Sequence, residues 1–162
     1  MRTAVLTIST SAAAAGAEDV SGPRLAELAT AAGCAVEVQE VVPDVRAAIA
    51  ERLRELVAAH VDLVFTTGGT GLTPDDHTPE ATRDVVERDA PGIAEAMRAE
   101  SIRRMPAGML SRGISGAAGR TLIVNFPGSP KAIDELFPVV APVLRHAVSQ
   151  LGREGGRRDG GH

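Results

Sequence analysis

Residues 61–78 read VDLVFTTGGTGLTPDDHT, and this stretch decides the fold. Its first part, residues 61–67, is mostly apolar and β-branched, which is typical of a central strand covered on both faces of a sheet. Its second part changes to Gly, Thr, Pro and Asp, and such residues favour turns. In open α/β sheets, ligands bind just beyond the carboxyl ends of the strands. The Gly-rich turn is therefore the first candidate for a binding site.

Strand and helix patterns alternate on both sides of this strand. Further strands are expected at 3–10, 34–42 and 121–126. Helices are expected at 23–32, 45–60, 79–90, 93–104 and 131–151. This alternation predicts an α/β fold with a mostly parallel central sheet that helices cover on both faces.

Some segments between these elements carry weaker patterns. The polar and Ala-rich stretch SAAAAGAEDVSG, residues 11–22, is expected to be a mobile loop. The last helical segment is expected to be interrupted by Pro138 and Pro142. Residues 1–151 form the predicted domain, and the Gly-rich, charged residues 152–162 are expected to be a flexible C-terminal tail.

Composition excludes several classes of protein. The chain has 162 residues, of which 44% are hydrophobic and 23% charged, as in a single globular domain. No apolar run reaches the roughly 18 residues that a membrane-spanning helix needs. A net charge of −4, with three Phe and no Trp or Tyr, argues against nucleic-acid binding. The single cysteine, Cys34, excludes an intrachain disulfide framework, so a cytoplasmic protein is expected.

Three turns follow predicted strands and should meet at one edge of the sheet. They are Pro43-Asp44, the Gly-rich turn Thr67–Gly71, and Asn125–Pro130. Successive glycines at 68, 69 and 71 allow backbone N–H groups to point into a shared concavity that binds anions such as phosphate. A tight turn without a ligand is the alternative, since neither a Walker A loop nor a dinucleotide-binding motif follows.

Charged residues near these turns have two interpretations each. Asp75 and Asp76 either cap the helix that follows or hold Mg²⁺ against a phosphate. Asp44 is either a helix N-cap before Val45 or a second carboxylate at the strand ends. Arg112 and Lys131 stand beside Gly-rich turns, where an anionic substrate needs positive charge.

Several motifs together resemble one known family. TTGGTGLTPDDHTPEATRDV, APGIAEAMRAESI, MLSRG and LIVNFPGSPKAI closely resemble the MogA/MoaB family of molybdenum-cofactor biosynthesis proteins and the G domain of gephyrin. The resemblance extends from about residue 3 to about residue 151. It implies a three-layer α/β/α molybdopterin-binding fold, usually a homotrimer.

The resemblance also implies an activity, molybdopterin adenylyltransferase, which converts molybdopterin and MgATP to adenylyl-molybdopterin and pyrophosphate. Hand-over of the product to a molybdenum insertase would follow. The catalytic residues implied are Asp76, which would bind Mg²⁺, and Asp44. The substrate-binding residues expected from the resemblance and the turns are Thr67, Gly68, Gly69, Thr70, Gly71, Glu100, Ser101, Ser111, Arg112, Asn125, Pro127, Gly128, Ser129 and Lys131.

Two positions depart from the family pattern. Many members have Ser-Asp after the first strand, where this chain has Ser9-Thr10, and many have Arg where this chain has Asp75. These departures leave an alternative open, a non-catalytic MoaB-like protein that binds molybdopterin or serves as a scaffold. A more distant alternative is a relative of the CinA type that acts on pyridine-nucleotide metabolites.

Overall fold

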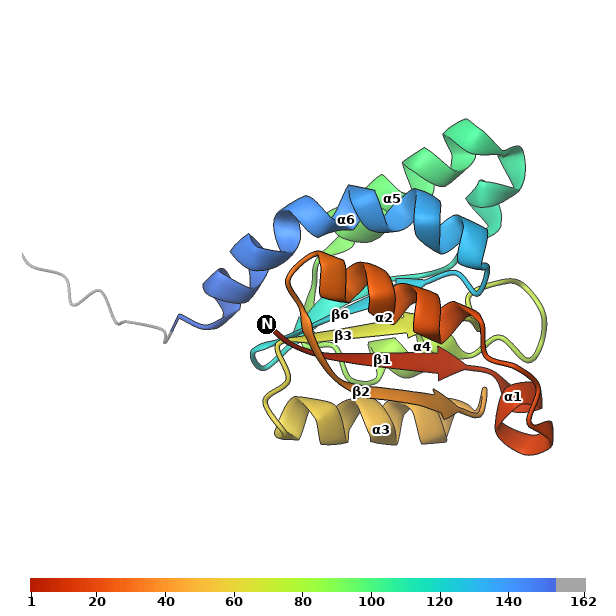
Figure 1. Ribbon diagram of the computed structural model, residues 1–162, viewed down its shortest axis with the longest axis horizontal. Helices are drawn as coiled ribbons and strands as arrows, with labels where there is room; N and C mark the ends of the chain where they lie inside the picture. The colour runs from red at the N-terminus through yellow and green to blue at the C-terminus, as the bar shows by residue number, and fades with distance from the viewer. Residues whose placement is uncertain (154–162) are drawn as a thin grey trace, which may run out of the picture.

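A computed structural model describes residues 1–153 and places a six-stranded sheet at the centre of the molecule (Figure 1). The strands are β1 (Arg2–Ile8), β2 (Ala35–Val42), β3 (Leu63–Thr67), β4 (Arg88–Asp89), β5 (Ser115–Ala118) and β6 (Thr121–Phe126). The helices are α1 (Thr10–Ala15), α2 (Ser21–Ala31), α3 (Arg46–Ala58), α4 (Thr78–Arg83), α5 (Pro91–Arg104), the 3₁₀ helix η1 (Pro106–Leu110) and α6 (Pro130–Leu151). Residues 154–162, most of the predicted tail, lie outside the described residues.

The sheet is mostly parallel, as the sequence predicts. Its strand order is β2-β1-β3-β6-β5-β4. Strands β2, β1, β3 and β6 run parallel, whereas β5 is antiparallel to β6 and β4 is antiparallel to β5. The four parallel strands therefore end at the same edge of the sheet.

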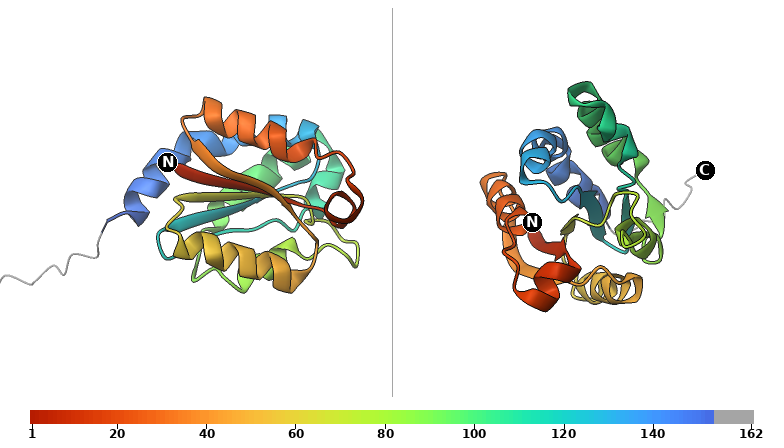
Figure 2. Two further views of the ribbon diagram at one scale, coloured as in Figure 1. Left: turned by 60° about the horizontal axis from the view of Figure 1, so that its bottom comes forward. Right: turned by 90° about the vertical axis from the view of Figure 1, so that its right-hand side faces the viewer.

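Two apolar clusters cover the two faces of the sheet and give the molecule three layers (Figure 2). On one face, α2, α5 and α6 pack on β1, β3 and β6, and all three phenylalanines of the chain, Phe65, Phe126 and Phe137, lie there with ring centroids 5.6–6.0 Å apart. On the other face, Ile49, Leu53 and other residues of α3 and α4 pack on the same strands. The three-layer α/β/α prediction is confirmed.

The loop predicted at 11–22 is wrong at its two ends, where α1 covers residues 11–15 and α2 covers residues 21 and 22; residues 16–20 form a loop as predicted, and its mobility stays a prediction. Ser9 caps α1, its hydroxyl accepting a hydrogen bond from the Ala12 N–H at 3.2 Å. Gly16 ends it with a φ of 64°. The next helix, α2, begins at Ser21, two residues before the predicted start at residue 23.

Two further boundaries differ from the sequence prediction. Helix α4 ends at Arg83, well short of residue 90, because the chain then pairs with β5. The N–H groups of Glu87 and Ala90 donate to carbonyls of that strand, at 2.9 and 3.0 Å. The expected interruption of the last helix does not occur either, since α6 continues through both prolines. Pro138 and Pro142 lie on its exposed side, where the carbonyls that lose a partner can face solvent.

Among residues 1–153, the helices are all too short or too polar to cross a membrane. Cys34 is buried, with 5% of its surface exposed.

Candidate functional site

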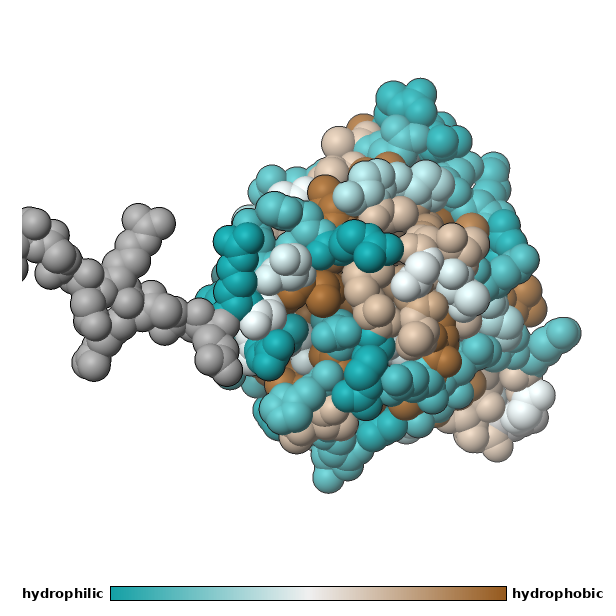
Figure 3. Space-filling view, turned by 60° about the vertical axis from the view of Figure 1, so that its left-hand side comes forward, coloured by the Kyte–Doolittle hydropathy of each residue, from teal (hydrophilic) through white to brown (hydrophobic). Residues whose placement is uncertain are grey.

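The three predicted turns meet at the carboxyl edge of the parallel strands, at the right of Figure 1. The Thr67 hydroxyl donates to the Pro127 carbonyl at 2.8 Å, and the Gly68 N–H donates to the Phe126 carbonyl at 3.2 Å. The face in Figure 3 lies around the opposite ends of the strands and mixes apolar with polar side chains. The predicted convergence of the turns is therefore confirmed.

The Gly-rich turn has a backbone that only glycine adopts readily. Gly68 and Gly69 have φ values of 98° and 64°. A Cβ atom on Gly68 would lie 2.5 Å from the carbonyl oxygen of Ile8, and one on Gly69 would lie 2.5 Å from Oδ2 of Asp44. The N–H groups at positions 69–71 donate no hydrogen bond to any residue that the structure describes. These donors can serve an anion.

Asp44 lies in the turn between β2 and α3, against the Gly-rich turn. Its Oδ1 accepts a hydrogen bond from the His77 N–H at 3.0 Å, so its carboxylate does not cap α3, whose N-cap is Val45. Burial raises the pKa of the Asp44 carboxyl; the His77 N–H opposes this, and the charges of Asp76 and Asp75 add to it. The interpretation of Asp44 as an N-cap is wrong.

Asp76 closes a short turn with Thr73. Its Oδ2 accepts hydrogen bonds from the Thr73 N–H at 2.9 Å and from the Thr73 hydroxyl at 2.8 Å. The same oxygen lies 2.9 Å from where a Cβ atom on Gly71 would be. The N-cap of α4 is His77, which makes no side-chain cap, so neither Asp75 nor Asp76 caps that helix.

Asp44 and Asp76 fit a hard cation such as Mg²⁺ in their chemistry. Asp44 Oδ2 and Asp76 Oδ1 accept no hydrogen bond from any residue that the structure describes. Mg²⁺ is commonly held by one or two carboxylates together with substrate phosphates and water. Residues 1–153 contain no group of three or more His, Cys, Asp or Glu side chains suited to a metal. A cation here would therefore take its remaining ligands from substrate and water.

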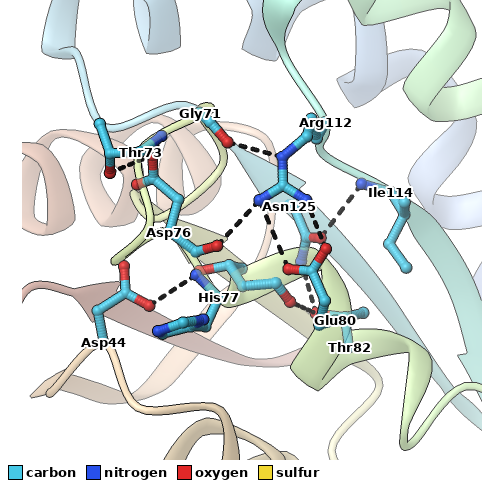
Figure 4. A network of polar contacts seen from close by, with 11 residues as sticks. Asp44, Gly71, Thr73, Asp76, His77, Glu80, Thr82, Arg112, Ile114 and Asn125 are labelled. Atoms are coloured by element: carbon cyan, nitrogen blue, oxygen red, sulfur yellow. Dashed lines mark hydrogen bonds and ion pairs between the residues drawn. The ribbon is translucent and has the colours of Figure 1, made fainter.

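Arg112 contacts the loop that carries Asp76, residues 71–76, directly. Its guanidinium donates to the carbonyls of Gly71 and Asp76 and pairs with Glu80, at the beginning of α4 (Figure 4). Burial acts to raise the pKa of Glu80, but the hydrogen bond from Arg112, a backbone hydrogen bond and the charges of Arg112 and Arg83 together outweigh burial, so the pKa is lowered. Glu80 did not stand out as a site residue in the sequence.

Asn125, predicted to bind substrate, is only 2% exposed, and its side chain bonds three neighbouring elements. Its amide donates to the hydroxyls of Thr66 and Thr82, each at 3.0 Å, and its Oδ1 accepts from the Ile114 N–H at 3.2 Å. The side chain thus joins β3, α4 and the residue that precedes β5; Figure 4 shows its contacts with Thr82 and Ile114.

Two hollows lie beside the turns, and several of the predicted substrate-binding residues line one or the other. One, of about 180 Å³, is lined by Ser101, Ser111, Asn125 and Pro127 together with apolar side chains of α5 and α6. The other, of about 260 Å³, is lined by Thr67, Gly68 and Gly128 together with residues of the β1–α2 connection.

Three predicted residues have other surroundings. Glu100 pairs with Arg103 and Arg104, whose hydrogen bonds lower its pKa to about 2. Ser129 caps α6, accepting a hydrogen bond from the Ala132 N–H at 3.4 Å. Lys131 is exposed and makes no hydrogen bond or ion pair with the residues that the structure describes.

Asp19 is a residue of this edge that sequence reasoning missed. Its carboxylate accepts hydrogen bonds from the Thr7 hydroxyl at 2.7 Å and from the Gly22 N–H at 3.0 Å, and it lines the larger hollow. The available signal was an Asp three residues before Gly22 at the beginning of a helix, a spacing typical of a side chain that caps a helix.

Comparison with known proteins identifies the family. Residues 4–146 match the family model described as "Probable molybdopterin binding domain". The chain belongs to the MogA/MoaB family. Molybdopterin adenylyltransferase of Escherichia coli is 38% identical over 138 residues, which are 83% of this chain and 71% of that protein.

Solved structures of MogA/MoaB proteins have the same fold. The MoaB enzyme of Thermus thermophilus is 42% identical, with a TM-score of 0.87 and coverage of 93% of this chain and 95% of that one. The Mog protein of Mycobacterium ulcerans is 40% identical, with a TM-score of 0.87 and coverage of 93% and 98%.

Some relatives are much longer than this chain. The Drosophila melanogaster protein cinnamon, a molybdenum cofactor synthesis protein, is 41% identical over 151 residues, which are 91% of this chain but 25% of that protein. The chain thus spans about a quarter of that relative's length.

Proposed function

We propose that this MogA/MoaB protein is a molybdopterin adenylyltransferase that uses ATP and Mg²⁺. A phosphate oxygen of molybdopterin attacks the α-phosphorus of ATP, the bond from that phosphorus to the bridging oxygen breaks, and pyrophosphate leaves. The single observation that carries the proposal is the placement of Asp44 and Asp76 against the Gly-rich turn. Relatives named molybdopterin adenylyltransferase support it.

The proposed roles follow from the contacts. Phosphate is already a nucleophile, so the protein has to position two anions and offset their charge. The N–H groups at positions 69–71 bind phosphate oxygens, and Asp44 and Asp76 hold Mg²⁺. Bound Mg²⁺ neutralises charge on the phosphates during transfer. Lys131, exposed beside the Asn125–Pro130 turn, supplies further positive charge to the substrates.

The remaining predicted residues are proposed to bind the substrates' other parts. Ser101, Ser111 and Pro127 line the smaller hollow, whose other walls are largely apolar and suit a flat heterocycle. Thr67, Gly68 and Gly128 line the larger and more polar hollow. Glu100 makes ion pairs and Ser129 caps a helix, so these two residues would act indirectly. They would stabilise α5 and the start of α6, whose side chains line the smaller hollow.

Pyrophosphate release tests the proposal. We expect release from MgATP only when molybdopterin is present, and we expect Asp76→Asn to abolish it while molybdopterin still binds. Molybdopterin binding by the unaltered protein without any release, at every Mg²⁺ concentration, would instead favour the non-catalytic alternative. Release without molybdopterin would point to another nucleotide chemistry.

We also propose that the protein is a homotrimer in the cytoplasm and passes its product to a molybdenum insertase. An apolar hollow of about 500 Å³ between α5 and α6, lined by Ile93, Val143 and Ala147 among others, supports association between copies, since Val143 is 45% exposed. Light scattering on the purified protein tests the trimer, and a monomer at micromolar concentration would contradict it.

A further inference from the structure

Arg112 uses its guanidinium on the protein itself. Its Nε donates to the Gly71 carbonyl at 2.7 Å and its Nη2 to the Asp76 carbonyl at 2.9 Å, while its Nη1 pairs with Glu80. Its own N–H donates to the Thr70 carbonyl at 2.9 Å. Both ends of the loop 71–76 are thus attached to one side chain (Figure 4).

The segment that carries Arg112 is itself held on both sides. Arg98, on α5, donates from Nε to the Ser111 carbonyl at 2.9 Å and from Nη2 to the Gly113 carbonyl at 2.8 Å. These bonds fix the backbone immediately before and after Arg112. The position of the loop is therefore defined from α5 through Arg112.

Within the loop, the contacts of Asp76 are mainly local. Within residues 1–153, its side chain and N–H bond only Thr73, three residues earlier. The rest of the fold holds the peptide group that follows Asp76 from both sides, since the Asp76 carbonyl accepts from Arg112 and the His77 N–H donates to Asp44. Glu80 fixes the guanidinium from the other side, so loss of either partner would loosen the attachment of the loop to Arg112.

We propose that Arg112 and Glu80 are positioning residues that together hold Asp76 in place for the reaction, and that Arg112 acts through the loop instead of binding a substrate anion. This inference rests on the proposed adenylyl transfer. The opposite role, a substrate-binding arginine, predicts a different response to loss of Glu80, because Arg112 would then be released towards the substrate.

The experiment compares Glu80→Gln, Arg112→Gln, Arg112→Lys and the double variant Glu80→Gln/Arg112→Gln. Steady-state pyrophosphate release gives kcat, the KM values for ATP and molybdopterin, and the Mg²⁺ concentration at half-maximal rate. We expect both Gln variants to lower kcat about 10- to 100-fold, as small displacements of catalytic groups do. KM should change less than about twofold, half-maximal rate should need more Mg²⁺, and the double variant should resemble the worse single one. Arg112→Lys should not restore kcat, since ammonium cannot make the forked contacts.

Asp84→Asn is the matched control. Asp84 follows α4 and pairs with Arg46 through two hydrogen bonds of 2.7 Å, so its loss also breaks an arginine–carboxylate pair of the same region. It does not touch the loop 71–76, and its kinetics should equal those of the unaltered protein. A large loss of kcat in this control would mean that Glu80→Gln acts through general destabilisation, and would overturn the proposal.

Two results separate this inference from the proposed function. A tenfold or greater rise in KM with kcat retained in Arg112→Gln, together with full activity of Glu80→Gln, would overturn it and make Arg112 a substrate ligand. If the unaltered protein releases no pyrophosphate, hydrogen exchange still tests whether Arg112 and Glu80 hold the loop 71–76 in place. The backbone amides of residues 71–73, 75 and 76 must then exchange faster in Glu80→Gln than in Asp84→Asn, and equal exchange would overturn the inference.

Discussion

The hydroxyl of Thr10 accepts a hydrogen bond from the backbone N–H of Asp44 at 3.1 Å. The bond joins the first turn of α1 to the β2–α3 turn and thereby holds the segment that carries a proposed metal ligand. Thr10 is one of the two positions at which a departure from the family pattern is expected from the sequence. A neutral acceptor at this place supports Asp44 without adding a carboxylate beside it.

Replacement of Thr10 by Val should therefore impair the reaction. Val keeps the branched shape of the Thr side chain but removes the hydroxyl that accepts from the Asp44 N–H. We therefore expect the rate of pyrophosphate release to fall several-fold. Because Thr10 is exposed and water can take over the N–H, the free energy of unfolding should fall by about 1 kcal/mol or less. Thr10→Ser should retain activity.

Ser11→Ala provides the control for this prediction. Ser11 bonds the Ser9 hydroxyl at 3.2 Å in the same helix and does not contact Asp44. Its activity should match that of the unaltered protein. Equal activity of Thr10→Val and Ser11→Ala would show that the Thr10 bond contributes nothing to the site.

Gly69→Ala should remove activity and destabilise the fold. At a φ of 64° an Ala residue costs about 1–2 kcal/mol, and its Cβ atom would lie 2.5 Å from Asp44 Oδ2. Chemical denaturation and pyrophosphate release measure the two effects. Gly92→Ala is the matched change, because Gly92 has open space around it and an ordinary φ; it should unfold at the same denaturant concentration or slightly higher.

The edge of the sheet that carries the site was predictable from local sequence. Each parallel strand has an apolar or alternating run of residues, and β2, β3 and β6 are each followed by a turn rich in Gly, Pro or Asp. Strand β5 was not predictable, because Ser115–Ala118 reads SGAA and small residues carry no strand pattern. Gly116 is there because Val86 and the Arg88 carbonyl leave no room for a Cβ atom. That reason lies in the tertiary structure.

Side-chain roles were harder to predict than positions. The sequence places Arg112 beside a Gly-rich turn and Asn125 at a strand end, and positive charge and amide groups there favour substrate contacts. Arg112 pairs with Glu80, 32 residues away in the chain, and Asn125 bonds Thr82, 43 residues away. Pairing over such separations follows only from the packing of α4 against the sheet.

Asn125→Leu should be strongly destabilising. The change leaves the hydroxyls of Thr66 and Thr82 and the Ile114 N–H without their partner in a buried region, and each such group costs about 1–3 kcal/mol. We expect a loss of about 3 kcal/mol in urea unfolding. Thr121→Val, at the other end of β6, removes one buried donor to the Val61 carbonyl and should cost about 1 kcal/mol. Similar losses in both variants would contradict the central role of Asn125.

The Arg112–Glu80 pair should stabilise the fold in a pH-dependent way. Because the pKa of Glu80 in the folded protein is below its ordinary value of 4.5, the pair's contribution is fully present above about pH 5 and is lost as pH falls through the folded pKa. Both side chains are about one-third exposed, so the contribution should be about 1 kcal/mol or less. Urea unfolding of the unaltered protein and of Glu80→Gln should therefore differ most near pH 7, and the difference should shrink towards pH 3. Glu51→Gln, on the exposed side of α3, should show no such trend, and a difference for Glu80→Gln that grows on acidification would contradict the sign of the shift.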